Sequence, residues 1–260
     1  MRRFVVGDIH GCYDKLISLL DVIKFSNEDT LYGIGDYCDR GNQPLEVLRF
    51  LMSLPNFIGI MGNHDIWPYQ YLDADLKKER LDRDVFRTWD HNGGFSTLKA
   101  LQDLGAEEKT KIRDWYGNLR FQIDLGNFIL KHTASPNTQD EKYSNLNLKA
   151  MIDESYCEKE YDNYIWDRLL DMEVFYKKKY KDTDYYKGIY DNSKWCIYGH
   201  TPYVEDGPHY DKDFRLINID CGAFANKNNY VLSKDGQLVI LDIDTFEWFK
   251  SDGSSGKFEK

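Results

Sequence analysis

The chain opens with short apolar runs that alternate with stretches of helical periodicity. Phe4 to Val6 is a predicted strand, and apolar residues at positions 13, 16, 17, 20 and 23 then repeat with the period of a helix. A second run ends at Ile34, and Pro44 after it suits the first turn of a helix. A third run covers Phe57 to Met61. This alternation predicts β-α units and an α/β fold.

Each of these three runs ends in glycine followed by Asp or Asn. The pairs are Gly7-Asp8, Gly35-Asp36 and Gly62-Asn63, and Gly199-His200 follows a fourth apolar run further along the chain. Glycine lets the backbone turn sharply, and α/β sheets place their ligands at the carboxyl ends of strands. We therefore expect these side chains to meet in one crevice.

The segment from residue 66 to 118 is helical and highly charged, with a break at Trp89-Asp90-His91-Asn92-Gly93-Gly94 that predicts a loop. Alternating apolar residues on both sides of Gly126-Asn127 predict a β-hairpin that leads to His132.

The second half of the chain begins with residues 138–194, which we interpret as a helical insert over the site. Strands are expected at 214–219, 230–232 and 238–243. We expect one domain over residues 1–250, and a disordered polar tail over residues 251–260.

Composition limits the partners and the location. The net charge of −10 disfavours broad nucleic-acid binding, which requires a basic surface. No apolar run approaches the roughly 18 residues of a membrane span, and no secretory signal follows Met1, so we expect a cytoplasmic protein without membrane contact. Five cysteines without a C-x-x-C pair predict reduced thiols rather than disulfides or a zinc cluster.

Six residues at predicted strand ends have the chemistry of metal ligands. Hard oxygens mixed with imidazoles suit Mn²⁺ first, and Fe or Zn²⁺ as alternatives. Two divalent ions that share Asp36 could hold a hydroxide between them, aimed at a phosphorus atom. The six residues are Asp8, His10, Asp36, Asn63, His132 and His200.

Further side chains complete a hydrolytic mechanism. His64 could donate a proton to the departing oxygen, and Asp39 could fix its tautomer. Arg40, with Arg168 in Ile165-Trp166-Asp167-Arg168, could bind the phosphate oxygens through forked hydrogen bonds. Because no Ser, Cys or Thr nucleophile is required, direct attack is favoured over a phosphoenzyme.

Three ordered motifs carry a family resemblance. Gly7-Asp8-Ile9-His10-Gly11, the stretch from Gly35 to Gly41, and Gly62-Asn63-His64-Asp65, followed by His132 and Gly199-His200-Thr201, resemble the signature of PPP-type metallophosphoesterases. That family includes protein Ser/Thr phosphatases and symmetrical diadenosine tetraphosphatases. The resemblance implies a calcineurin-like fold, in which two mixed β-sheets lie sandwiched between helices, with a dinuclear metal site at their edge.

The resemblance also implies a role for each matched residue. Asp8, His10 and Asp36 look like ligands of the first metal, and Asp36, Asn63, His132 and His200 like those of the second. His64 with Asp39 is similar to the proton-donor pair, and Arg40 to the phosphate-binding arginine. Asp65 departs from the family because Glu is usual there, and Thr133-Ala134 replaces the usual small residue and glycine.

The subfamily rests on a second group of residues. Trp89 with Asn92-Gly93-Gly94 and Thr97, and later Trp166-x-Arg168, look most like the phage-lambda-type and bacterial protein phosphatases. Asn92 could face the substrate or make a structural turn, and Trp166-x-Arg168 could instead be a surface anchor.

The sequence therefore favours a metal-dependent phosphomonoesterase that acts on phosphorylated protein, peptide or a small phosphoester, as protein Ser/Thr phosphatases do. One alternative is a symmetrical bis(5'-nucleosyl)-tetraphosphatase, and another is an inactive binding scaffold of the same fold.

Overall fold

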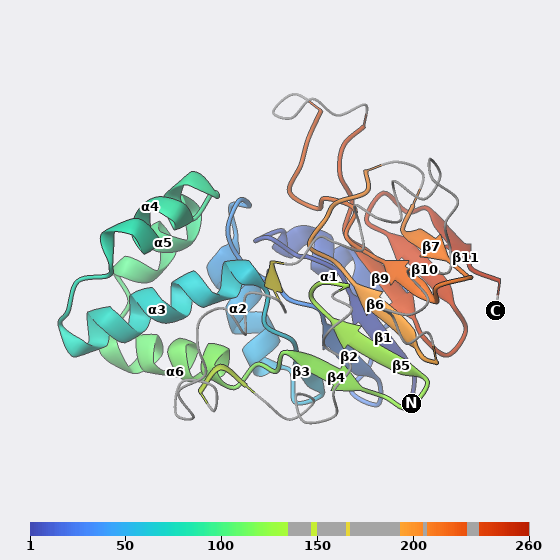
Figure 1. The fold of residues 1–260 in the computed structure, drawn as a ribbon, viewed down its shortest axis with the longest axis horizontal. Coiled ribbons are helices and arrows are strands. Elements are labelled where there is room, and N and C mark those ends of the chain that lie inside the picture. Colours follow the sequence, from blue (N-terminus) through green and yellow to red (C-terminus); the bar gives the residue numbers. More distant parts are fainter. Residues whose placement is uncertain (135–146, 150–164, 167–192, 205–206, 228–233, 260) are drawn as a thin grey trace.

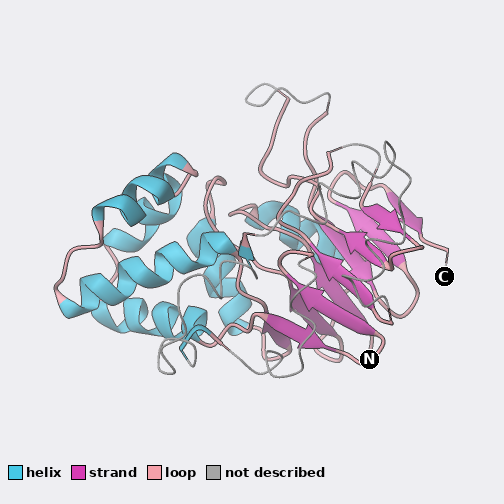
Figure 2. Cartoon of the chain, viewed as in Figure 1, coloured by secondary structure: helices cyan, strands magenta, loops and turns pink. Residues whose placement is uncertain are grey.

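The computed structural model describes residues 1–134, 147–149, 165–166, 193–204, 207–227 and 234–259. Its strands form two mixed sheets, and Figure 1 shows helices α3 to α6 gathered at one end of the molecule and the strands at the other. Figure 2 gives the same division by secondary structure. This is the predicted α/β architecture.

The larger sheet has six strands in the order β11-β10-β9-β1-β2-β3. β1, β2 and β3 are parallel, so their carboxyl ends meet at one edge. β9, β10 and β11 extend the sheet in antiparallel fashion on the other side of β1. The strands are β1 (Arg3–Val6), β2 (Thr30–Gly33), β3 (Phe57–Gly59), β9 (Val239–Asp242), β10 (Glu247–Lys250) and β11 (Ser255–Lys257).

The smaller sheet has five strands in the order β4-β5-β6-β8-β7. β5, β6 and β8 are parallel, and the predicted hairpin joins β4 to β5 in antiparallel register. The strands are β4 (Gln122–Asp124), β5 (Phe128–Lys131), β6 (Trp195–Tyr198), β7 (His209–Asp211) and β8 (Leu216–Asn218).

Six helices are described, and two of them cover the larger sheet. Leu16 and Leu19 of α1 and Leu48 of α2 are fully buried in one cluster with Phe4 and Leu31 of the sheet. Full burial of each such side chain contributes about 1.5–3 kcal/mol. The helices are α1 (Tyr13–Val22), α2 (Pro44–Ser53), α3 (Asn63–Lys77), α4 (Arg83–His91), α5 (Phe95–Gln102) and α6 (Ala106–Gly117). None of them is long and apolar enough to span a bilayer, within the part of the chain searched.

A second apolar cluster lies between the two sheets. Val5 and Ile34 from the larger sheet's side pack with Leu130, Ile197 and Ile217 of the smaller sheet. Because both sheets bury the same cluster, the ends of their parallel strands are held at one level.

The C-terminal tail corrects the sequence prediction of disorder. β11 pairs with β10, with Gly256 opposite Trp248. The ring of Phe258 stacks on Tyr210 with centroids 4.7 Å apart. The polar composition was misleading because pairing with β10 and the stack of Phe258 on Tyr210 hold this short edge strand in place. The prediction also omitted β7 and β10.

Other predictions fall outside the described residues. The proposed helical insert at 138–194 does so almost wholly, as do Arg168 and the strand expected at 230–232. The four described cysteines, Cys12, Cys38, Cys196 and Cys221, are free thiols.

Candidate metal centre

Five strand ends bring the predicted ligand residues together. Asp8 and His10 follow β1, and Asp36 and Asn63 follow β2 and β3. His132 and His200 follow β5 and β6 of the other sheet. All six side chains are buried. The expected crevice is therefore a buried polar cluster where the edges of the two sheets meet.

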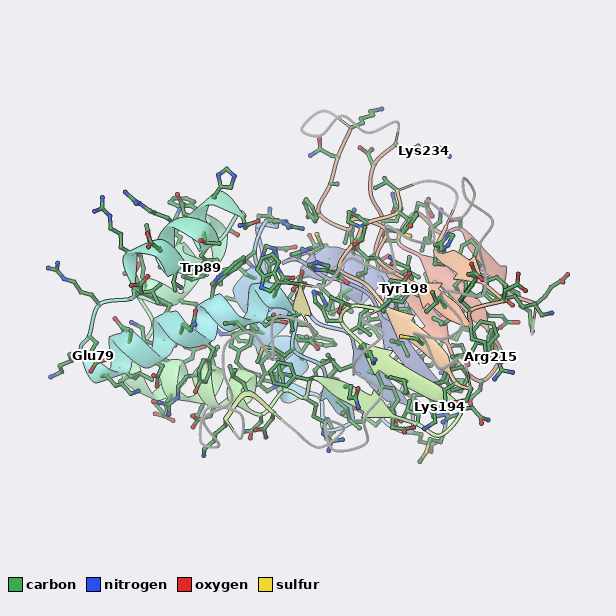
Figure 3. The ribbon with its side chains drawn as sticks, viewed as in Figure 1. Glu79, Trp89, Lys194, Tyr198, Arg215 and Lys234 are labelled. Carbon is green, nitrogen blue, oxygen red and sulfur yellow. The ribbon has the colours of Figure 1, made fainter. Side chains whose placement is uncertain are left out.

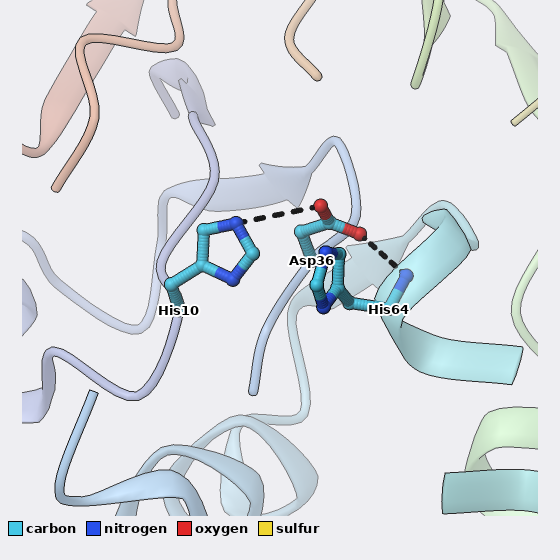
Figure 4. Close-up of side chains that lie close together, drawn as sticks. All are labelled: His10, Asp36 and His64. Atoms are coloured by element: carbon cyan, nitrogen blue, oxygen red, sulfur yellow. Dashed lines mark hydrogen bonds and ion pairs between the residues drawn. The ribbon is translucent and has the colours of Figure 1, made fainter. Parts of the chain in front are cut away.

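Asp36 lies at the middle of this cluster. Its Oδ2 is 3.5 Å from His10 Nε2, and its Oδ1 is 3.5 Å from His132 Nε2. Oδ1 also accepts the backbone N–H of His64 at 2.9 Å, as Figure 4 shows. Two groups of metal-binding chemistry share this carboxylate: one with His10 and His64, the other with His132 and His200.

Backbone carbonyls set the tautomers of two of the histidines. Nδ1–H of His10 donates to the carbonyl of Cys38 at 2.9 Å, and Nδ1–H of His132 donates to the carbonyl of Ile34 at 2.8 Å. A carbonyl can only accept, so the proton of each neutral ring lies on Nδ1. Each Nε2 is therefore left with a lone pair close to Asp36, the form in which histidine binds a metal ion.

The arrangement fits bound cations. His132 Nε2 lies 3.0 Å from Asn63 Oδ1, so a lone pair faces another acceptor atom. Nδ1 of His200 lies 2.9 Å from the same oxygen. Oδ1 of Asp8 is buried without a hydrogen-bond partner among the described residues. A divalent ion would satisfy these acceptors, and carboxylate, amide and imidazole donors suit Mn²⁺, Fe or Zn²⁺.

Electrostatics point the same way. Burial, reinforced by the carboxylates of Asp220 and Asp36, raises the pKa of Asp8 well above its ordinary value. Burial and Asp36 likewise raise the pKa of Asp65. The pKa of Asp36 itself is lowered, because the surrounding histidines outweigh the effect of burial. Such a concentration of buried carboxyl groups is favourable when cations balance it.

The glycines before the ligands provide room for them. A Cβ on Gly62 would collide with Asp36 Oδ1, and one on Gly199 would collide with Asp8 Oδ1. A Cβ on Gly35, whose φ is +100°, would lie 2.8 Å from His132 Nδ1. The repeated glycines therefore allow neighbouring loops to approach the ligand side chains closely, in addition to allowing the sharp turns.

Asp65 holds two of these strand ends together. Its Oδ2 accepts the N–H groups of Asp36 and Gly62, both at 2.8 Å, and its Oδ1 accepts that of Tyr37 at 3.1 Å. The same carboxylate caps the first turn of α3. The shorter Asp in place of the usual Glu therefore reaches the backbone of both loops.

His64 and Arg40 lie beside the ligand cluster. Nδ1–H of His64 donates to Asp39 Oδ2 at 2.8 Å, and the ring's Nε2 accepts from Arg40 Nη2 at 2.9 Å. Arg40 Nη1 donates to His10 Nε2 at 2.9 Å. With Nδ1–H donating to Asp39, Nε2 is the nitrogen through which His64 could transfer a proton.

The face of Phe224 supports the Arg40 guanidinium, whose central carbon lies 4.5 Å from the ring centroid. The edge of the same ring meets His10, with centroids 4.9 Å apart. The sequence analysis missed Phe224, since no local pattern links residue 224 to residue 40.

Asn92 lines the cavity beside the site, and its carbonyl accepts from Arg40 Nε at 3.5 Å. Its side chain donates to the carbonyl of Thr88 at 2.7 Å and so ends α4. A contact between Asn92 and substrate stays a prediction.

A cavity of about 680 Å³ opens beside the metal cluster. Arg40 and His200 belong both to the lining of this cavity and to the metal cluster with its neighbours. The ring of Phe95 is 65% exposed and lies at the cavity wall. The apolar lining residues include Phe95, Pro202, Val204 and Phe224. Polar side chains of His91, Asn92 and Ser96 line it as well, so the cavity offers both apolar and polar contacts beside Arg40.

Comparison of the sequence with known proteins finds phosphoesterases. A family model described as calcineurin-like phosphoesterase matches residues 1–203. A symmetrical bis(5'-nucleosyl)-tetraphosphatase of Erwinia tasmaniensis is 48% identical over 130 residues, which cover 48% of this chain and 47% of the relative. One from Salmonella paratyphi B is 46% identical over 137 residues, covering 48% and 46%. The chain thus matches just under half the length of these relatives.

Solved structures agree in fold. A cold-active protein-tyrosine phosphatase of a psychrophilic Shewanella superposes with a TM-score of 0.58 at 18% identity, over 99% of this chain and 80% of that one. A protein serine/threonine phosphatase of Saccharomyces cerevisiae superposes with a TM-score of 0.54 at 13% identity, over 94% and 73%.

Proposed function

We propose a function from the premise that this chain belongs to the calcineurin-like phosphoesterase family: it hydrolyses symmetrical dinucleoside tetraphosphates with the help of two divalent metal ions. The observation that carries the reaction type is the Asp36 carboxylate, whose two oxygens face two separate groups of histidines. The substrate is supported by the names of the relatives that are 46–48% identical and by the partly apolar cavity beside Arg40.

The residues of the site would have the following roles. Divalent ions held by the six ligand residues would polarise the phosphate and supply a nucleophile near neutral pH. Arg40 would bind phosphate oxygens through its forked donors. Water would add its oxygen to phosphorus and release a proton as the central P–O–P bond breaks. His64 would act in the form that is protonated on Nε2 as well as Nδ1, give the Nε2 proton to the departing phosphate oxygen, and be restored by a proton from solvent. The cavity would hold a nucleoside.

A second candidate is hydrolysis of phosphoserine or phosphothreonine in proteins, which the sequence alone favoured. A specific observation supports it: the buried pair of His64 and Asp39 is a proton donor of the kind that an alkoxide leaving group needs. A departing nucleoside diphosphate is a much weaker base and needs such help less. The preferred metal, Mn²⁺, and the cytoplasmic location are likewise proposals.

One experiment separates the candidates. The purified chain with Mn²⁺ is incubated with diadenosine tetraphosphate or a phosphoserine peptide, and products are separated by chromatography. Formation of two ADP, with the peptide left intact, is the expected result. Rapid release of phosphate from the peptide with the dinucleotide unchanged would establish the second candidate. No turnover of either substrate, with no metal retained, would favour the binding scaffold.

A further inference from the structure

Trp89 makes an unusual contact with the proton-donor pair. Its indole is buried, with 1% of its surface exposed, and its Nε1–H donates to both carboxylate oxygens of Asp39 at 3.0 Å. The Oδ2 atom of Asp39 also accepts Nδ1–H of His64 at 2.8 Å. Trp89 lies on α4, where Figure 3 labels it, 50 residues after Asp39 in the chain.

The surroundings hold the indole in this position. A Cβ on Gly94 would collide with Cδ1 and Nε1 of Trp89, so the loop backbone packs directly on the ring. The backbone N–H of Gly94 donates to the carbonyl of Trp89 at 3.0 Å. In α5, which follows this loop, Thr97 Oγ1 accepts the backbone N–H of Asp39 at 2.8 Å. The α4–α5 segment therefore holds both the backbone and the carboxylate of Asp39.

The consequence concerns the geometry of His64. An aspartate carboxylate can rotate about its last bond, and the imidazole that donates to it would then move as well. A second donor, fixed by packing, restricts that rotation and satisfies the remaining acceptor capacity of a buried carboxylate. Proton transfer to a leaving group requires the acid within about 2.6–3.2 Å of the acceptor atom, so small displacements are costly.

We infer that Trp89 is a positioning residue of the proton donor: its indole N–H aligns Asp39, and through Asp39 it aligns His64 with the leaving-group oxygen. This inference rests on the proposed function, because it needs a phosphate ester or anhydride to be cleaved. It adds that α4, which contributes no expected metal ligand, affects only the proton-donation step.

The test uses two aryl phosphates that differ in leaving group. p-Nitrophenyl phosphate needs little protonation of its leaving group, whereas phenyl phosphate needs more. Trp89→Phe removes the N–H and keeps an aromatic ring. We expect it to lower kcat for phenyl phosphate about tenfold more than kcat for p-nitrophenyl phosphate, with Mn²⁺ present. His64→Asn should give the same selective loss, and the double variant should lose little more than His64→Asn alone.

Gly94→Ala provides a second variant that keeps the tryptophan and pushes on its ring. It should give the same selective loss. Gly105→Ala is the matched control, because Gly105 also precedes a helix and an added Cβ there has no neighbour within 4 Å. It should leave the ratio of the two kcat values unchanged.

Equal losses on both substrates in Trp89→Phe and Gly94→Ala would overturn the inference and leave Trp89 a packing residue. If His64→Asn also loses both activities equally, the assignment of His64 as the acid fails as well. If the unaltered chain cleaves neither aryl phosphate nor diadenosine tetraphosphate, the proposed function itself is wrong, and the inference is overturned with it.

Discussion

Asp36 and its neighbours adopt a backbone conformation that most residues avoid. His10, Asp36, Asp39, Arg40 and His200 all have φ between +45° and +71°, in the left-handed region. Each such residue costs on the order of 1 kcal/mol or more and persists only where the surrounding structure imposes it. Hydrogen bonds from the Asp36 and Tyr37 N–H groups to Asp65 supply part of that constraint. These five residues lie where the ligand side chains converge, although Lys24, Lys78, Arg215 and Phe246 share the conformation elsewhere.

Replacing the shared carboxylate tests the metal site. Asp36→Asn keeps the shape of the side chain but removes the charge that faces both histidine groups. We expect metal content, measured by elemental analysis after dialysis against Mn²⁺, to fall from about two ions per chain to one or fewer. Hydrolytic kcat should fall at least about a hundredfold. Asp84→Asn, at a carboxylate that is 90% exposed, should change neither. Undiminished metal content in Asp36→Asn would contradict the shared-ligand role.

Phe95 tests the cavity. Its ring is exposed at the cavity wall, so Phe95→Ala should leave the fold intact. Loss of a stacking surface for a base should raise KM for diadenosine tetraphosphate about five- to tenfold. KM for glycerol phosphate, which has no ring, should not change. Phe86→Ala, at a half-exposed ring that does not line the cavity, is the control. An equal rise in KM for both substrates would argue against a base at Phe95.

At the scale of elements, the site depends on how closely strand ends approach each other. Gly62 ends the segment after β3 and caps α3, and an added Cβ would meet both Asp36 Oδ1 and the Asp36 backbone nitrogen. Parallel pairing of β1, β2 and β3 brings the three loops to one level, and the glycines then let them touch. Each strand end contributes one or two side chains, so none forms a site alone.

Gly62→Ala should therefore damage activity more than stability. We expect kcat with Mn²⁺ to fall about a hundredfold, because a displacement near 1 Å at the reacting centre costs that much. Gly105→Ala is a close control, since Gly105 is also an extended residue that caps a helix, α6, and an added Cβ would be in open space. Gly62→Ala should lose about 1–3 kcal/mol more unfolding free energy in urea than Gly105→Ala, because its Cβ displaces packed atoms. Full activity in Gly62→Ala would show that the loops can separate without cost.

At the scale of the whole molecule, the family assignment and the fold agree. The match over residues 1–203 confirms the metallophosphoesterase family that the ordered motifs indicated. The two sheets pack on the apolar cluster between them. The N-terminal strand, β1, lies near the centre of the larger sheet. Its start is tied to β2: Arg2 donates to Asp29 from its backbone N–H at 3.0 Å and from Nη2 at 2.6 Å.

The contact between Arg2 and Asp29 predicts how stability depends on pH. Hydrogen bonds from Arg2 lower the pKa of Asp29 below its ordinary value. A carboxyl group with a lowered folded pKa stabilises the fold above its unfolded pKa of about 3.9, and that stabilisation is lost as the pH falls. Asp29→Asn should therefore reduce the unfolding free energy by about 1–3 kcal/mol at pH 7.

The difference between Asp29→Asn and the unaltered chain should shrink when urea unfolding is repeated near pH 3. There the carboxyl group is mostly protonated in the unfolded chain but still ionised in the folded chain, whose Asp29 pKa is lowered, so part of the stabilisation by the charge is lost. Asp84→Asn should cost less than about 0.5 kcal/mol at either pH. A difference that is the same at both pH values would mean that the charge on Asp29 does not contribute.

The sequence by itself determined the β-α units, the hairpin before His132, the family and the side chains that meet at the strand ends. These features are local: hydrophobic periodicity reports on a few consecutive residues, and each motif joins a strand to its own loop. Only the tertiary structure decided which atoms face one another. Trp89 on Asp39, Phe224 beneath Arg40 and the pairing of β11 with β10 join residues that no short pattern connects. Such contacts arise when separate elements pack into a common core, and that packing turned a set of ligand-like residues into a site with a defined geometry.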